Sequence, residues 1–72
     1  MERLSREIAA GVRERRRALG LTQQDLAELA GVSERFVRFV EQGKSSVQLD
    51  ALGAVLDALG LELRVATRGS AR

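Results

Sequence analysis

The stretch from Thr22 to Gln42, TQQDLAELAGVSERFVRFVEQ, constrains the fold more than any other part of this 72-residue chain. It holds two short helical patterns, over residues 23–30 and 34–42, with only residues 31–33 between them. Gly31 can adopt the positive φ that a sharp turn requires. Val32 is placed to fill the elbow, and the hydroxyl of Ser33 can cap the second helix. This layout predicts a helix-turn-helix, in which a tight turn holds two helices at a steep angle.

Two further helices are predicted because apolar residues recur at a spacing near 3.6 residues. The first covers residues 2–19 and ends at Gly20, and the last covers residues 49–59 and ends at Gly60. Arg16 interrupts the apolar face of the first helix, where a cation needs a partner. The residues predicted to face the core are Leu4, Ile8, Val12, Leu19, Leu26, Leu29, Ala30, Val37, Val40, Leu49, Leu52, Val55, Leu56 and Leu59.

The pattern changes to a period of two after Gly60, where Leu61, Leu63 and Val65 alternate with less apolar neighbours. A single strand in a helical chain leaves its backbone groups without partners. Pairing with the same strand of a second copy, related by a two-fold axis, would satisfy them. The alternative is a short amphipathic tail that lies over the helices. We therefore predict an all-α fold with a helix-turn-helix domain over 1–60, a dimerisation strand over 61–67 and a flexible basic tail over 68–72.

The composition excludes several classes of function. The chain has no Cys and no His, so disulfides and the common zinc sites are excluded. It also lacks Tyr, a glycine-rich phosphate loop and any carboxylate cluster with metal-ligand spacing, so we expect no enzyme activity, no metal and no cofactor. No apolar run approaches the ~18 residues of a membrane span, and no secretory leader opens the chain. We expect a soluble, cytoplasmic protein.

Basic residues indicate a nucleic-acid partner. Eleven of the twelve cations are Arg, the residue suited to bidentate contacts with phosphate and guanine. In the second helix of the pair, Glu34, Arg35, Arg38 and Phe39 are predicted to face outward. In a helix-turn-helix this helix enters the major groove, where Arg binds guanine, Glu accepts from cytosine and Phe contacts a thymine methyl. The alternative is that Glu34 and Arg38 form an ordinary i,i+4 pair on a solvated surface.

Residues 11–60 resemble the lambda-repressor/Cro-type, or XRE-like, helix-turn-helix family. The resemblance lies in the run LGLTQQDLAELAGVSERFVRFVEQGK, with Thr-Gln at the helix start, Gly31-Val-Ser at the turn and Glu41 before Gly43-Lys44. Within that family the chain is most similar to HipB-like antitoxins and related short regulators, because LDALGLEL runs from the last helix into a C-terminal strand.

The resemblance implies a role for individual residues. It implies an ion pair between Arg16 and Glu41 that joins the first helix to the base-reading helix, which would supply the partner that Arg16 needs. Base-reading positions match Glu34, Arg35, Arg38 and Phe39. Phosphate contacts are expected from Thr22, Gln23, Ser33, Gly43, Lys44 and Ser45.

The function predicted from these features is repression of transcription by a homodimer on a palindromic operator in double-stranded DNA. The HipB likeness further implies a bacterial, nucleoid-associated antitoxin that restrains a kinase-like toxin and represses its own operon. Two alternatives are a stand-alone repressor without a toxin partner and a protein-interaction module that does not bind DNA.

Overall fold

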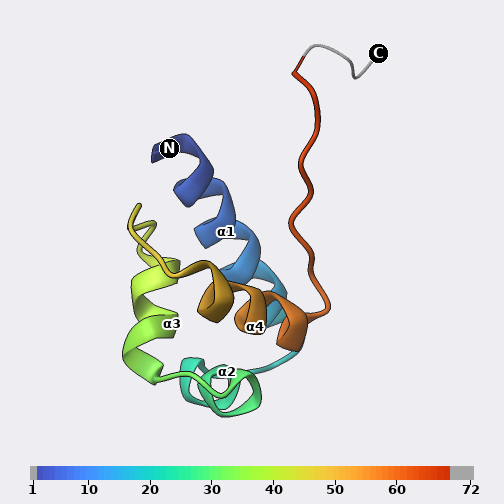
Figure 1. Ribbon diagram of the computed structural model, residues 1–72. Helices are drawn as coiled ribbons and strands as arrows, with labels where there is room; N and C mark the ends of the chain where they lie inside the picture. Colours follow the sequence, from blue (N-terminus) through green and yellow to red (C-terminus); the bar gives the residue numbers. More distant parts are fainter. Residues whose placement is uncertain (1, 69–72) are drawn as a thin grey trace.

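Four α-helices make up most of residues 2–68, the part of the chain that the computed structural model describes (Figure 1). They are α1 (Glu2–Ala18), α2 (Gln23–Ala30), α3 (Glu34–Glu41) and α4 (Leu49–Leu59). The all-helical architecture and the helix-turn-helix are therefore confirmed, with helix ends within one residue of those predicted. None of these helices is both long enough and apolar enough to cross a membrane.

Local side-chain chemistry fixes the helix-turn-helix. At the start of α2 the hydroxyl of Thr22 accepts from the backbone N–H of Asp25 at 2.9 Å, and the Asp25 carboxylate accepts from the N–H of Thr22 at 2.9 Å. Gly31 ends α2 with a φ of 72°, a conformation that costs any side-chain-bearing residue energy. The Ser33 hydroxyl then accepts from the N–H of Phe36 at 3.0 Å. The predicted turn at Gly31 and cap at Ser33 are present, and a capping box between Thr22 and Asp25 begins α2.

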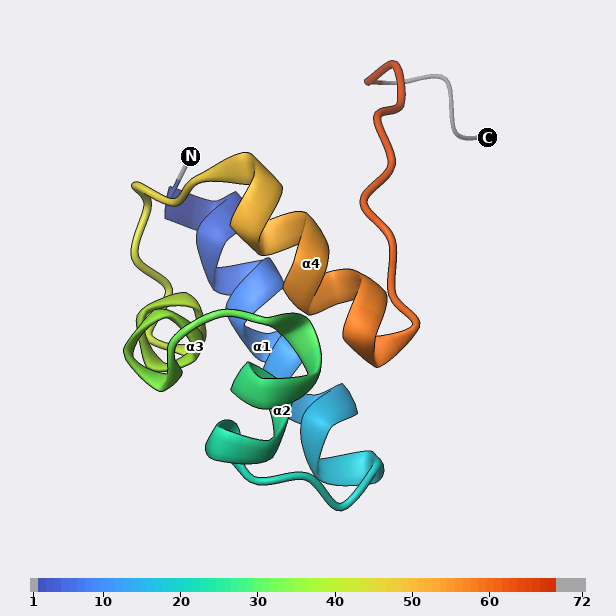
Figure 2. The ribbon, with the colours of Figure 1, turned by 60° about the horizontal axis from the view of Figure 1, so that its bottom comes forward.

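The two halves of the domain share one core. The helix α2 packs against α3 and α4, and α1 packs across α3 and α4 from the other side (Figures 1 and 2). Val32 fills the elbow of the turn as predicted and packs against the core together with Leu21. The buried residues of this core are Val12, Leu26, Ala27, Val37, Val40, Leu52, Val55, Leu56 and Leu59.

Four leucines predicted to face the core are more than 40% exposed: Leu4, Leu19, Leu29 and Leu49. Leu29 shows why. The buried face of α2 is formed by Leu26, Ala27 and Ala30. At about 100° per residue, Leu29 lies roughly 110° from the centre of that face. From the sequence pattern, the buried face of α2 could include Leu26 with Leu29 or Leu26 with Ala27 and Ala30. The packing of α4 against α2 buries the face with the two alanines.

Residues 61–67 run as an extended segment that leaves the end of α4 and passes beside the helices (Figure 1). Leu61 is partly buried against the core, but Leu63 is 48% exposed and Val65 is fully exposed. The packing expected of a tail over the helices is thus present at Leu61, is partial at Leu63, which lines a hollow with Leu4 and Leu49, and is absent at Val65. No strand is present within residues 2–68, and pairing with a second copy stays a prediction. Most of the predicted basic tail, residues 69–72, lies outside the described residues.

Candidate nucleic-acid interface

A buried ion pair fixes the C-terminal end of α3. Arg16 on α1 donates from Nε to Glu41 Oε2 at 2.7 Å and from Nη2 to Glu41 Oε1 at 3.0 Å. Its remaining nitrogen, Nη1, donates to the carbonyl of Leu21 at 2.9 Å. The two charged residues are only 9% and 8% exposed. Such a bidentate geometry satisfies both charges where water is excluded, and the pairing implied by the family resemblance is confirmed.

Two more side chains complete this network around Glu41. Gln23, at the start of α2, donates from Nε2 to Glu41 Oε1 at 3.1 Å. Arg13 donates from Nη1 to the Glu41 backbone carbonyl at 2.9 Å. The network therefore joins α1, α2 and the last residue of α3, and it leaves no buried side-chain nitrogen or oxygen without a partner among residues 2–68.

The ionisation of the pair follows from this environment. Burial by itself would raise the pKa of Glu41, but the hydrogen bonds from Arg16 and Gln23, together with the charges of Arg16 and Arg13, hold the pKa of Glu41 below its ordinary value. The hydrogen bonds that Arg16 donates to Glu41 raise the pKa of Arg16 against the opposing effect of burial. Both groups are therefore charged near neutral pH, and the end of α3 is held by a charged clamp.

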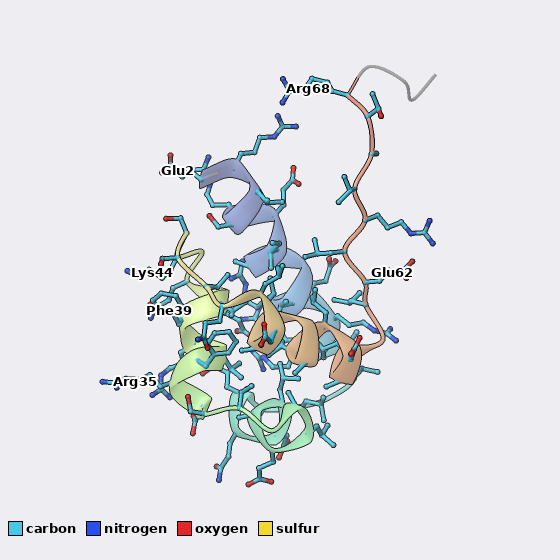
Figure 3. All side chains as sticks on the ribbon, viewed as in Figure 1. Glu2, Arg35, Phe39, Lys44, Glu62 and Arg68 are labelled. Atoms are coloured by element: carbon cyan, nitrogen blue, oxygen red, sulfur yellow. The ribbon has the colours of Figure 1, made fainter. Side chains whose placement is uncertain are left out.

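The outward face of α3 presents two arginines in different states. Arg38 pairs with Glu34 one turn away, with 3.0 Å between Nη1 and Oε2, and both side chains are about half exposed. The i,i+4 pair considered as an alternative is thus formed. Arg35 is exposed, extends away from α3 (Figure 3), and forms no hydrogen bond or ion pair within the described chain. Arg35 is therefore the cation on this face that is free to bind a new ligand.

Phe39 is half-buried, not exposed as predicted. Its ring lines a hollow between α3 and the loop before α4, together with Phe36 and Val47. The loop residues 46–48 line the other side of this hollow, an arrangement that the spacing within α3 alone does not indicate. Arg35, Phe39 and Lys44 lie on the same side of the molecule, along α3 and the loop that follows it (Figure 3).

The residues predicted to contact phosphate occupy helix ends and one loop. Thr22 and Ser33 are N-caps whose hydroxyl oxygens accept from the backbone, so each O–H remains able to donate to a phosphate. Gln23 already donates to Glu41, which fixes its amide at the start of α2. Gly43, Lys44 and Ser45 follow α3, with Lys44 and Ser45 exposed.

Sequence reasoning missed two structural arginines. Arg13 binds the carbonyl at the end of α3, as described above, and Arg15 donates from Nε to the carbonyl of Leu59, the last residue of α4, at 2.9 Å. Cations stabilise helix C-termini because carbonyl groups there lack partners. The four arginines within residues 13–17 are the available signal in the sequence, but side-chain spacing does not indicate which backbone carbonyl an arginine binds.

The fold and this surface define a small helical domain built on a helix-turn-helix whose second helix presents cations outward. Residues 12–65 match the family model described as Helix-turn-helix. The chain belongs to this XRE-type helix-turn-helix family. Among the described residues, no group of three or more acidic side chains has the arrangement of a metal site.

Two curated relatives are named as uncharacterized HTH-type transcriptional regulators. One, from Methanothermobacter thermautotrophicus, is 41% identical over 51 residues, which cover 71% of this chain and 74% of the relative. The other, y4mF from Sinorhizobium fredii, is 36% identical over 66 residues, which cover 92% of this chain and 87% of the relative. The family match over residues 12–65 covers the second half of α1 and all of α2, α3 and α4.

Proposed function

We propose that the protein is a sequence-specific DNA-binding repressor of transcription that reads the major groove with α3. The observation that carries this proposal is the free, exposed Arg35 on the outward face of a helix whose far end is clamped by Arg16 and Glu41. A base-reading helix must be held rigidly, because a displacement of about 1 Å breaks bidentate contacts to a base edge. The two relatives, both named as transcriptional regulators, support this role.

The proposed contacts divide into base reading and phosphate binding. Arg35 binds guanine O6 and N7, Arg38 and Glu34 act as a pair that reaches the adjacent base, and Phe39 supplies an apolar contact. The phosphates on either side of this groove are bound by groups around α3. Backbone N–H groups at the N-termini of helices and exposed cations are suited to binding anions. The proposed phosphate-binding residues are Thr22, Gln23, Ser33, Gly43, Lys44 and Ser45.

The proposed active form is a homodimer. The segment 61–67 is extended, residues 62–66 pair with no strand within residues 2–68, and Leu63 and Val65 are exposed along it. An apolar hollow beside it is lined by Leu4, Leu49 and Leu63. Antiparallel pairing of two such segments would satisfy the backbone and cover these leucines. Two copies of α3 would then meet a palindromic operator in major-groove segments about 34 Å apart.

Repression follows if the dimer occludes polymerase. The further role as an antitoxin rests on the likeness of the LDALGLEL ending to HipB-like proteins. It is tested by the neighbouring reading frame and by co-purification of its product. A kinase-like product that binds this chain would support the antitoxin role, and a neighbour of another class would favour a stand-alone repressor.

Selection from a random pool of DNA duplexes, followed by gel shift, tests the central proposal. We expect an enriched palindrome whose binding weakens steeply as salt rises, because phosphate neutralisation releases counterions. A protein-interaction module without a DNA role would enrich no sequence. The control is an Arg35→Ala variant that keeps the wild-type thermal unfolding, which we expect to lose preference at one base pair while retaining weaker binding.

A further inference from the structure

Two opposite charges lie close together on the extended segment that follows α4. Arg64 donates from Nε to Glu62 Oε2 at 2.7 Å, and its Nη2 lies 2.7 Å from the same oxygen. Both side chains are mostly exposed, and Glu62 points away from the helices (Figure 3). Side chains alternate between the two faces of an extended chain, so the other face carries Leu61, Leu63 and Val65. The segment therefore has one apolar face and one charged face.

This segment is the one proposed above to pair with a second copy of the chain. Residues 62–66 pair with no strand within residues 2–68, so they can form a ladder with another chain. Leu61 packs against the core, and Leu63 lines a hollow with Leu4 and Leu49. The apolar face is thus turned toward the helices at these two residues, and a paired segment must keep its own apolar residues on the same face to cover them.

Two-fold symmetry restricts how two identical antiparallel segments can be aligned. If the axis passes beside one residue, the residues at equal distances before and after it lie opposite one another, and opposite side chains share a face. An axis between two residues would instead set apolar residues of one copy opposite even-numbered residues of the other. Because such an alignment mixes the two faces, the axis must pass beside a single residue.

Charge and hydrophobicity exclude three of the four positions for the axis within residues 62–65. With the axis beside residue 62, Glu62 faces Glu62 of the other copy, and with the axis beside residue 64, Arg64 faces Arg64. Like charges directly opposite one another are destabilising. With the axis beside residue 65, Leu63 faces Thr67 and the apolar face is interrupted.

The remaining axis, beside Leu63, suits both faces. Glu62 of each copy then faces Arg64 of the other, so four charges of alternating sign lie together on the charged face. On the apolar face the two Leu63 side chains meet, and Val65 of each copy lies opposite Leu61 of the other. Leu61 lines two hollows beside the segment, so Val65, which is fully exposed in the single chain, gains apolar neighbours there.

We propose that Glu62 and Arg64 set the alignment of the dimer, with the two-fold axis beside Leu63, and thereby make the segment specific for a second copy of this chain. Because both side chains are exposed, their ion pairs contribute little to affinity. Their effect is on register, which complementary charges fix, and on the exclusion of chains that would bring like charges together. This inference rests on the dimer proposed above and adds to it the residues that select the partner.

Single cysteines locate the axis, because the chain has no Cys of its own. Residues on the axis have Cα atoms about 4.5–5.5 Å apart, within the reach of a disulfide. Residues one position from the axis are already about 8 Å from their counterparts, beyond that reach. Under oxidation Leu63→Cys should therefore give a cross-linked dimer. Val65→Cys, the matched control on the same face, should give none.

Reversal of the charges tests the two selecting residues. Differently tagged Glu62→Arg and Arg64→Glu chains each bring like charges together in their homodimers but form two ion pairs with each other. At saturating concentration the mixed dimer should exceed the one half expected from random exchange, and a chain with both changes should dimerise like wild type. The control mixes Glu62→Arg with Arg68→Glu, a combination that would pair only around residue 65, and should stay at one half.

These measurements separate the alignment from the dimer itself. A cross-link through Leu63→Cys alone, with an excess of the mixed dimer, supports the inference. It is overturned if Val65→Cys forms the cross-link instead, if neither variant does, or if the mixed dimer stays at one half. A wild-type chain that sediments as a monomer, or a dimer that survives deletion of residues 61–72, would overturn the proposed seam as well.

Discussion

Arg16 and Glu41 form a buried bidentate pair that connects the last turn of α1 to the last residue of α3, across 25 positions of sequence. Every nitrogen of the Arg16 guanidinium is used, since Nη1 also binds the carbonyl of Leu21 in the loop before α2. The pair therefore holds the end of α3 against α1 and close to the loop that leads into α2. Removing either partner leaves the other charge buried without compensation.

The first prediction concerns stability. Replacing Glu41 with Gln leaves the Arg16 charge unpaired, and we expect the free energy of unfolding to fall by about 3 kcal/mol, measured by urea denaturation. A loss of this size is a large share of the stability of so small a domain. The control is Glu34→Gln, which breaks the half-exposed pair with Arg38 and should cost less than about 1 kcal/mol. Equal losses in the two variants would contradict the central role of the buried pair.

The second prediction concerns acid. The pKa of Glu41 is lowered in the folded protein, so its stabilising contribution is complete above the unfolded-state pKa of about 4.3. That contribution is lost as the pH falls through the lower, folded-state pKa. The stability difference between wild type and Glu41→Gln should therefore be largest near neutral pH and shrink steadily in acid. Urea titrations from pH 7 to pH 2.5 measure it, and a difference that stays constant would show that Glu41 acts through packing alone.

Local signals in the sequence predicted the fold well because they act within a few residues. Thr22 with Asp25, Gly31 and Ser33 fix the start of α2, the turn and the start of α3 through bonds between near neighbours. The period of apolar residues located all four helices for the same reason. Arg16 could be recognised as needing a partner, but the identity of that partner came from the family resemblance.

Features that depend on distant segments were not predicted. Phe39 lines a hollow together with the loop over residues 46–48, and no pattern inside α3 encodes that loop's path. Arg13 and Arg15 find backbone carbonyls at the ends of α3 and α4, which have no signature in side-chain spacing. If the proposed dimer forms, the conformation of residues 61–67 depends on contacts with the second copy of the chain.

The third prediction concerns the turn. Gly31 has a φ of 72°, and an alanine there must adopt the left-handed conformation at a cost of about 1–2 kcal/mol. Gly53 is a matched control, because it lies inside α4 and a Cβ added there meets nothing within 4 Å. Gly53→Ala should therefore stabilise the domain by about 0.5–1 kcal/mol. Chemical denaturation measures the change in the free energy of unfolding for each variant, which should be a loss for Gly31→Ala and a gain for Gly53→Ala. Destabilisation by both changes would show that α4 does not tolerate the added methyl group.

The fourth prediction separates the two outward arginines. Arg35→Ala should relax preference at one base pair and cost about 1–3 kcal/mol of binding. Arg38→Ala should also lower the affinity for DNA, but for a different reason. It leaves the Glu34 carboxylate unpaired, and this negative charge then lies near the phosphates. Replacing both Arg38 and Glu34 with Ala should then recover part of that loss. Binding to an operator library measures preference and affinity together. If Arg35→Ala weakened all sequences equally, Arg35 would be a phosphate contact and not a base contact.

The fifth prediction concerns the dimer. In the proposed strand, Leu63 and Val65 lie on one face, and Glu62 and Arg64 lie on the other. Leu63→Lys combined with Val65→Lys places like charges opposite one another at an apolar seam, and we expect the dimer dissociation constant to rise at least tenfold in sedimentation equilibrium. Glu62→Lys adds a cation to the opposite face and should change it far less. Deletion of residues 61–72 should have the largest effect. A dimer of unchanged affinity after that deletion would show that the two copies associate through another surface of the helical domain.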